Sequence, residues 1–204
     1  MHASADEEIA DKRRARGART RRSVLDRAVD MASLHGLDGL SFGRVAAAAG
    51  LSKAGVQTLF GTKEALQLAT VDRARERFLD LVVRPALSAP SGVERLRVLI
   101  DRWIDYAERP EFPGGCFFVA NLAEFDSRQG PIRDSLQRAR RDWIAQIAAE
   151  LRQAVADGEL DLDPDLSAFQ IDAVLSSANI ALRLGDPGAV DQVRRIAEGL
   201  LAGA

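Results

Sequence analysis

Apolar residues recur along almost the whole chain with the spacing of α-helices. The first stripe of this kind consists of Val24, Leu25, Ala28, Val29 and Ala32, and Gly36 follows it as a candidate C-terminal cap. Apolar positions that return every three or four residues lie on one face of a helix. We find no convincing alternation of apolar and polar residues of the kind that indicates a strand. The pattern therefore predicts an all-α fold.

Capping and helix-breaking residues divide this pattern into about nine helices. Ser41, Ser52 and Thr62 are candidate N-caps, because their side chains can accept a hydrogen bond from a backbone amide of the first turn. Glycine and proline mark most of the predicted helix ends. The expected helices cover approximately residues 24–35, 42–49, 53–60, 63–85, 93–109, 115–126, 131–157, 166–184 and 187–202.

Two of these helices, within residues 41–60, are separated by a very short turn. A sharp angle between two helices needs small residues where the backbones approach, and this segment offers Ala46, Ala47 and Ala49. Gly50 can adopt the left-handed conformation that ends the first helix, and Ser52 can begin the second. Leu51 is expected to fill the angle between them. This combination predicts a helix-turn-helix.

The second helix of this motif is expected to expose a set of short or hydrogen-bonding side chains: Lys53, Ala54, Gly55, Gln57 and Thr58. A surface that enters the major groove needs short residues for close approach and a few donors and acceptors for base edges. Lys53, Gln57 and Thr58 are therefore candidates for contacts to base edges or adjacent phosphates. An ordinary tight helical corner without a DNA-binding role is the alternative.

Charge is distributed unevenly along the chain. Residues 12–63 contain 11 basic and three acidic residues, whereas residues 64–204 contain 17 basic and 23 acidic residues, within a net charge of −2. A basic N-terminal quarter favours a nucleic-acid partner, although a solvated charged arm would look the same. Helix N-termini also attract phosphate, and the residues expected to reach phosphates near the motif are Arg44, Thr62 and Lys63.

Residues 1–18 are expected to form a flexible basic arm. Arginines continue past its end, and those nearest the helix-turn-helix are Arg19, Arg21 and Arg22. Such an arm can follow the DNA backbone or enter a minor groove. Disorder in the absence of DNA is the alternative.

Aromatic residues gather in the middle third of the chain, and a few polar residues lie among them. In a helical domain aromatic residues are first of all core residues, but an apolar lining with a few convergent polar groups is also how small ligands are bound. The candidate ligand-binding residues are Trp103, Tyr106, Cys116, Phe117, Asn121, Glu124, Trp143, Asn179 and Arg183. Cys116 could have a lowered pKa near a helix start and act as a sensor, although a buried structural thiol is the favoured interpretation.

The last two predicted helices are apolar around much of their circumference. Pairing them with the same helices of a second copy would form a four-helix interface, whereas burial within one chain is the alternative. The candidate interface residues are Phe169, Ala173, Ser177, Ile180, Val193, Ile196 and Leu200. A dimer would present two recognition helices to a palindromic site.

Several classes of function find no support in the sequence. His2 and His35 are the only histidines, Cys116 is the only cysteine, and no metal-ligand spacing, nucleophile motif or phosphate-binding loop occurs. We therefore expect no catalysis, no metal and no cofactor. The sequence shows no signal peptide and no run of 18 apolar residues, so we expect a cytoplasmic protein without a membrane partner.

Residues 21–66 resemble the DNA-binding domain of TetR-family transcriptional regulators. The resemblance lies in "VLDRAVDMASLHG", "LSFGRVAAAAGLSKAGV", Phe60 and "TKEAL". It implies a homodimeric regulator, usually a repressor, that a small-molecule inducer releases from its DNA operator. The family commonly has tyrosine at the position of Gln57 and histidine or tyrosine at that of Leu59. Gln57 has instead an amide that can pair with adenine.

We therefore expect a helix-turn-helix domain over residues 19–66 and a helical ligand-binding and dimerisation domain over residues 67–204. The alternative is a DNA-binding co-regulatory or architectural protein whose C-terminal domain binds a protein partner. A fully packed core would favour that alternative, and a cavity would favour a small ligand.

Overall fold

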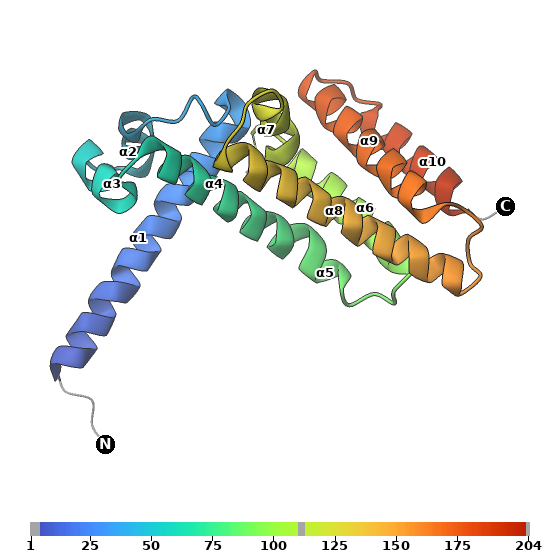
Figure 1. Ribbon diagram of the computed structural model, residues 1–204, viewed down its shortest axis with the longest axis horizontal. Helices are drawn as coiled ribbons and strands as arrows, with labels where there is room; N and C mark the ends of the chain where they lie inside the picture. Colours follow the sequence, from blue (N-terminus) through green and yellow to red (C-terminus); the bar gives the residue numbers. More distant parts are fainter. Residues whose placement is uncertain (1–4, 110–112, 203–204) are drawn as a thin grey trace.

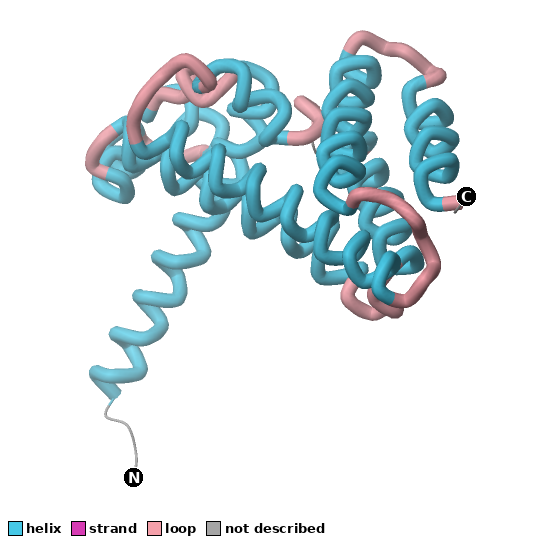
Figure 2. The backbone as a smooth tube through the Cα atoms, turned by 45° about the vertical axis from the view of Figure 1, so that its right-hand side comes forward, coloured by secondary structure: helices cyan, strands magenta, loops and turns pink. Residues whose placement is uncertain are grey.

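The computed structural model describes residues 5–109 and 113–202, and over these residues the regular structure is entirely helical (Figure 1). The predicted all-α fold is therefore confirmed. A small N-terminal group of helices lies at one end and a larger group of long helices at the other, with the last two helices farthest from the first (Figures 1 and 2).

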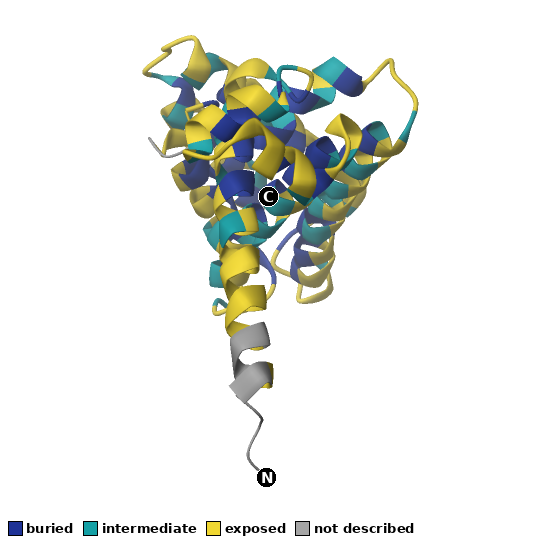
Figure 3. Ribbon diagram, turned by 90° about the vertical axis from the view of Figure 1, so that its left-hand side faces the viewer, coloured by how far each residue is buried: buried dark blue, intermediate teal, exposed yellow. Residues whose placement is uncertain are grey.

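The N-terminal group contains α1 (Ala5–His35), α2 (Phe42–Ala49) and α3 (Lys53–Phe60). Helix α1 begins well before the first apolar stripe, so the segment expected to be a flexible arm is helical from Ala5 onward. Its N-terminal part projects away from the other helices (Figure 1) and is exposed where it is described (Figure 3). Gly36 follows α1 with a positive φ of 74°, as its predicted capping role requires.

The larger group begins with a continuous helical run from Lys63 to Ala86. This run consists of α4 (Lys63–Phe78), a π-helical turn η1 (Leu79–Val83) and α5 (Arg84–Ala86). The remaining helices are α6 (Val93–Glu108), α7 (Phe117–Phe125), α8 (Pro131–Ala156), α9 (Pro164–Arg183) and α10 (Ala189–Leu201). With the continuous run counted once, the described residues form nine helices, as predicted.

The π-helical turn has a local cause in the sequence. Pro85 has no backbone N–H and cannot donate to the carbonyl of Leu81, one helical turn earlier, and its ring would also crowd that carbonyl. A wider turn before the proline accommodates both effects. Leu79 and Val83 of this turn face the cavity described below.

Long-range packing joins the two groups of helices. Helix α1 packs against α2, α4 and α7, and α8 packs against α4, α7 and α9. Side chains buried between these helices include Val24, Leu66, Phe117, Leu136 and Leu151. Apolar faces of the long helices thus form one core that extends into the N-terminal group.

Candidate DNA-binding surface and ligand cavity

The helix-turn-helix is formed by the capping interactions that the sequence predicts. The Ser41 hydroxyl accepts a hydrogen bond from the Arg44 amide at 3.3 Å, and the Ser52 hydroxyl accepts one from the Gly55 amide at 3.1 Å. Gly50 has φ 65° and ψ 32°, which is the left-handed conformation. These interactions end α2 and start α3 within a very short turn.

Two details of the predicted turn were wrong. Leu51 is 39% exposed and does not fill the angle between the helices. Ala47 lies on the exposed side of α2, whereas Ala46 is buried and Ala49 is partly buried. The angle is filled instead by larger side chains, because Val45 of α2 and Val56 of α3 are both fully buried.

One face of α3 is exposed and carries all five residues predicted for it: Lys53, Ala54, Gly55, Gln57 and Thr58. Val56 and Phe60 are buried on the opposite face, and this anchors the helix. The Thr58 hydroxyl donates to the Ala54 carbonyl at 2.9 Å, so its methyl group and oxygen have a defined direction. The exposed face is short, polar and free of bulky apolar groups, as major-groove binding requires.

Three predicted phosphate-contacting residues lie at helix starts near α3. Arg44 donates from Nη1 to the Gly39 carbonyl at 2.8 Å, and Lys63 donates from Nζ to the Asp38 carbonyl at 2.7 Å. Thr62 caps α4 by accepting from the Ala65 amide at 3.1 Å. Both cationic side chains are exposed, and each donates to the loop before α2. Lys63 Nζ also lies 3.9 Å from Asp38 Oδ1, so this carboxylate offsets part of its charge.

The predicted arginines of the arm lie on α1. Arg19, Arg21 and Arg22 are exposed. The Arg21 guanidinium lies 5.1 Å from the centre of the Phe60 ring, and Arg22 lies 3.5 Å from a carboxylate oxygen of Glu76. The first contact connects α1 directly to the end of α3.

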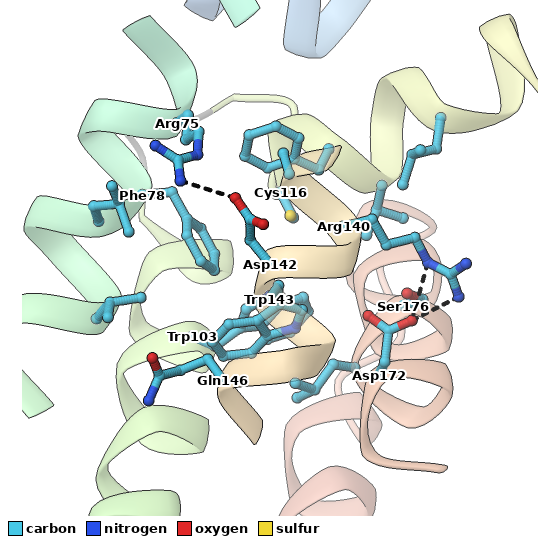
Figure 4. Close-up of a pocket in the computed structure, with 17 residues that line it drawn as sticks. Arg75, Phe78, Trp103, Cys116, Arg140, Asp142, Trp143, Gln146, Asp172 and Ser176 are labelled. Carbon is cyan, nitrogen blue, oxygen red and sulfur yellow. Dashed lines mark hydrogen bonds and ion pairs between the residues drawn. The ribbon is translucent and has the colours of Figure 1, made fainter. Parts of the chain in front are cut away.

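The larger group of helices contains a cavity of 190 Å³ (Figure 4). It lies among α4, η1, α6, α7, α8 and α9, and the loop before α7 contributes one wall. Its apolar lining includes Phe78, Trp103, Phe118 and Trp143. The charged and polar side chains that line it are Arg75, Arg140, Asp142, Gln146, Asp172 and Ser176.

Three of the nine predicted ligand-binding residues line this cavity: Trp103, Cys116 and Trp143. The other six are not among its lining residues: Tyr106, Phe117, Asn121, Glu124, Asn179 and Arg183. Several of these six bond to backbone groups that position the cavity wall. The sequence reading missed Arg75, Arg140, Asp142 and Asp172. Asp172 could have been noticed as a charged residue within the apolar stretch of α9.

Asn121 and Glu124 connect α7 to the loop after α1. The Leu37 amide donates to Asn121 Oδ1 at 2.9 Å and to Glu124 Oε2 at 2.8 Å. The Leu37 carbonyl accepts from Gln67 Nε2 of α4 at 2.8 Å. Both backbone polar groups of this one residue are thus bonded to side chains of the larger group of helices, which helps to hold the helix-turn-helix against that group.

The loop before α7 is held by two further predicted residues. Asn179 Oδ1 accepts from the Cys116 amide at 2.7 Å, and the Tyr106 hydroxyl accepts from the Phe117 amide at 3.3 Å. Arg183 donates to the Pro113 carbonyl at 3.1 Å. A Cβ at Gly115 would lie only 2.4 Å from Asn179 Oδ1, so this close approach requires glycine.

Cys116 does not have the lowered pKa that its place before α7 could have produced. Burial raises the pKa of its thiol to about 11, and the hydrogen bonds from the Val119 and Phe118 amides only partly oppose this effect. The thiol is therefore protonated at neutral pH and is a weak nucleophile. This outcome agrees with the favoured interpretation of a buried structural cysteine.

Helix α9 carries an exposed apolar stripe. Phe169 is 57% exposed and Ile180 is 56% exposed, and Leu166 and Ala173 continue the stripe, with Ser177 within it and Leu184 directly after the helix. On α10, Ile196 is exposed and Leu200 is partly buried. Val193 is buried within the chain in this structure. Exposed apolar side chains that adjoin one another along a helix are typical of a surface that contacts another protein.

In the described part of the chain, no group of three or more His, Cys, Asp or Glu residues is arranged to bind a metal ion. None of the helices described is both long and apolar enough to cross a membrane.

Two family models match the chain. The C-terminal domain of tetracycline-repressor-like proteins matches residues 92–197, and the model of bacterial regulatory proteins of the tetR family matches residues 24–70. A search of the curated proteins finds no match to the sequence.

Solved structures with the same fold are numerous. A TetR transcriptional regulator from Chloroflexus aurantiacus J-10-FL is 26% identical, with a TM-score of 0.80 and coverage of 92% of this chain and 96% of that chain. A putative transcriptional regulator from Saccharomonospora viridis, solved in complex with choline, is 21% identical, with a TM-score of 0.76 and coverage of 91% and 96%. AibR, solved in complex with isovaleryl coenzyme A and operator DNA, is 20% identical, with a TM-score of 0.71 and coverage of 91% and 100%.

The family models cover both the helix-turn-helix and most of the larger group of helices, and the exposed face of α3 has the form that major-groove recognition needs. This chain belongs to the TetR family and is a DNA-binding transcriptional regulator.

Proposed function

We propose that this regulator is a cytoplasmic, homodimeric repressor that a small organic molecule releases from a palindromic operator. Residues 19–66 contact DNA, and residues 67–204 bind the ligand and the second copy. The observation that carries the proposal is the link between the cavity and the helix-turn-helix. Cys116 lines the cavity just before α7, and Asn121 and Glu124 of α7 bond the Leu37 amide.

This link gives a ligand a physical means of affecting DNA binding. A molecule in the cavity contacts Phe118, Val119 and Leu122 of α7. A shift of α7 also moves the loop before α2, because the Leu37 and Asp38 amides are bonded to α7 side chains. A ligand that binds one position of α7 more tightly than another shifts the protein toward that position and so changes its affinity for DNA. DNA binding changes the affinity for the ligand by the same free energy.

The exposed stripe of α9 supports the homodimer. Apolar residues at positions 166, 169, 173, 180 and 184 follow helical spacing along one exposed face. The same face of a second copy would cover it and form a helical bundle. A two-fold dimer places its recognition helices about 34 to 36 Å apart, one turn of B-DNA, or a multiple of that distance.

The alternative is a co-regulator whose larger domain binds a protein. A fully packed core would favour it, whereas the 190 Å³ cavity supports a small ligand. AibR, which has a similar fold, was solved with a small molecule, isovaleryl coenzyme A, and operator DNA bound together. We therefore favour ligand-controlled DNA binding without catalysis.

Genomic footprinting of the purified protein, with and without the double variant Gln57→Ala/Thr58→Ala, tests the DNA-binding part. Both side chains are exposed, so the variant should fold normally, keep binding to nonspecific DNA and lose its preference for the operator. Gln153→Ala on α8 serves as a matched control that should keep the preference. Retained selectivity in the double variant would contradict the proposal.

The dimer is tested by Phe169→Glu, which should produce monomers in sedimentation analysis. Leu87→Glu is a matched control, because Leu87 is similarly exposed at 53% but follows α5 and does not belong to the face of α9. A dimer that survives Phe169→Glu would place the interface elsewhere.

The arginines of α1 are tested by their effect on salt dependence. Arg19→Ala should weaken binding to operator and random duplex equally and should lower the slope of log K against log salt by about one. A change in sequence preference would assign Arg19 to base contacts instead.

A further inference from the structure

Asp172 is a buried carboxylate in the wall of the cavity. The residue is 5% exposed, and its Oδ2 accepts from Arg140 Nε at 3.2 Å and Nη2 at 2.7 Å. Within the described residues, Oδ1 of the same carboxylate has no hydrogen bond. No buried side-chain nitrogen or oxygen of those residues lacks a partner, so Oδ1 must reach open space. Asp172 lines the cavity, and Figure 4 shows the oxygen that is not bonded to Arg140 on the side nearer Trp143, so it is available there as a hydrogen-bond acceptor.

Arg140 compensates only part of the Asp172 charge. Burial raises the pKa of the Asp172 carboxyl above its ordinary value despite the hydrogen bond and the positive charge of Arg140. The Arg140 side chain is 43% exposed, so solvent weakens its attraction. In Figure 4 its guanidinium is drawn on the side of Asp172 that faces away from Trp143. The cavity therefore lacks part of the positive charge that a buried carboxylate needs.

The other charged residues of the cavity do not supply the missing positive charge beside Asp172. Arg75 and Asp142 form their own pair at 2.9 Å, and both side chains are about half exposed. A neutral, solvent-screened pair contributes little to the field inside the cavity. Gln146 uses its amide nitrogen to bond Glu150 Oε1 at 2.9 Å.

Aromatic rings form part of the apolar lining. Phe78 contacts Phe118 and Trp143 edge to face, with ring centres 6.0 and 5.1 Å apart. Trp103 also lines the cavity. The face of an aromatic ring attracts a cation, and tryptophan does so most strongly.

We propose that this cavity binds a small organic cation, in which a protonated amine pairs with Asp172 and an apolar body lies among the aromatic side chains. The inference rests on the proposal that the cavity is the ligand site of the regulator. The volume of 190 Å³ exceeds that of the roughly 150 Å³ cavity that binds benzene. It therefore suits a single ring with a short aminoalkyl chain.

Other ligand charges fit this lining less well. An anion would compete with Asp172 for Arg140 and would leave a buried carboxylate without its partner, which is costly. A neutral apolar molecule would displace water from Asp172 Oδ1 without replacing its hydrogen bond. A neutral hydroxyl can donate to that oxygen as well, but a cationic donor also supplies positive charge while the Arg140 pair remains intact.

Three molecules of matched shape test the proposal on the intact protein: phenethylamine, phenethyl alcohol and hydrocinnamate. Trp103 and Trp143 are the only tryptophans in the chain, and both line the cavity, so intrinsic fluorescence reports occupancy directly. We expect the amine to bind at least ~10-fold more tightly than the alcohol, and the anion to bind most weakly. Equal or tighter binding of the alcohol or the anion, or no binding of any of the three, would overturn the proposal.

The variant Asp172→Asn should remove the preference for the amine, because it keeps the shape of the side chain but not its charge. Asp142→Asn, which removes the rim carboxylate, should keep that preference. The same titrations in the presence of operator DNA separate this inference from the proposed function. Release of DNA by hydrocinnamate but not by phenethylamine would overturn the cation site and leave ligand-controlled repression standing.

Discussion

The exposed face of α3 and the cavity are both binding surfaces, but they are encoded in different ways. The α3 face comes from five residues within one eight-residue helix, and its N-cap Ser52 is three residues from its partner Gly55. The cavity is lined from five helices, a π-helical turn and a loop. A surface built from neighbours in sequence can be read from the sequence, whereas a surface built from distant segments depends on how the helices pack.

The largest effect on stability is expected from a substitution of a glycine at a long-range contact. A Cβ at Gly114 would lie 2.1 Å from the Ser33 carbonyl oxygen, so Gly114→Ala must push α1 and the loop before α7 apart. We expect a loss of about 3 kcal/mol or more in the free energy of unfolding. Gly43→Ala in α2 is the matched control, because its Cβ would meet no atom within 4 Å. Denaturant unfolding measures both, and equal stabilities would contradict the close approach.

The buried amide of Asn121 tests the same long-range packing through hydrogen bonds. Its Nδ2 donates to the Phe117 carbonyl at 2.8 Å, while its Oδ1 accepts from Leu37 across the two groups of helices. Asn121→Ala leaves a cavity and removes these bonds, so we expect a loss of about 2 to 3 kcal/mol in the free energy of unfolding. Glu124→Gln, which keeps an acceptor for the Leu37 amide, should cost about 1 kcal/mol or less.

The same contrast explains what could be predicted. Periodicity and caps gave the number of helices and the helix-turn-helix, because each cap acts within one turn of its own helix. Asn121 was expected to bind a ligand because it lies among aromatic residues, but it bonds the Leu37 peptide 84 residues away. No local pattern reveals such a partner. Arg140 was missed for the same reason, since its pairing with Asp172 depends on how α8 lies against α9.

A local interaction should produce a smaller effect that stays near the motif. Ser52→Ala removes the acceptor for the Gly55 amide at the start of α3, so we expect a loss of about 1 kcal/mol in the free energy of unfolding. Ser52→Thr keeps the hydroxyl and should retain most of the stability. Hydrogen exchange should show faster opening of α3 in the alanine variant, and unchanged exchange would mean that packing alone holds the helix.

The smallest expected effect has the opposite sign and concerns Asp172. Its carboxyl has a raised pKa in the folded protein, so the folded state binds its proton more tightly than the unfolded state does. The charged carboxylate therefore destabilises the fold at pH values above the folded-state pKa, and this penalty fades as the pH falls toward the ordinary range of aspartate.

Asp172→Asn should raise the stability of the ligand-free protein at neutral pH, and the gain should shrink as the pH falls toward ~4. Asp142→Asn at the exposed rim should change stability by no more than about 0.5 kcal/mol at any pH. Denaturant unfolding across this pH range measures both variants. A loss of stability in Asp172→Asn at neutral pH would mean that Arg140 compensates the carboxylate fully. The cavity would then have no uncompensated negative charge to attract a cation.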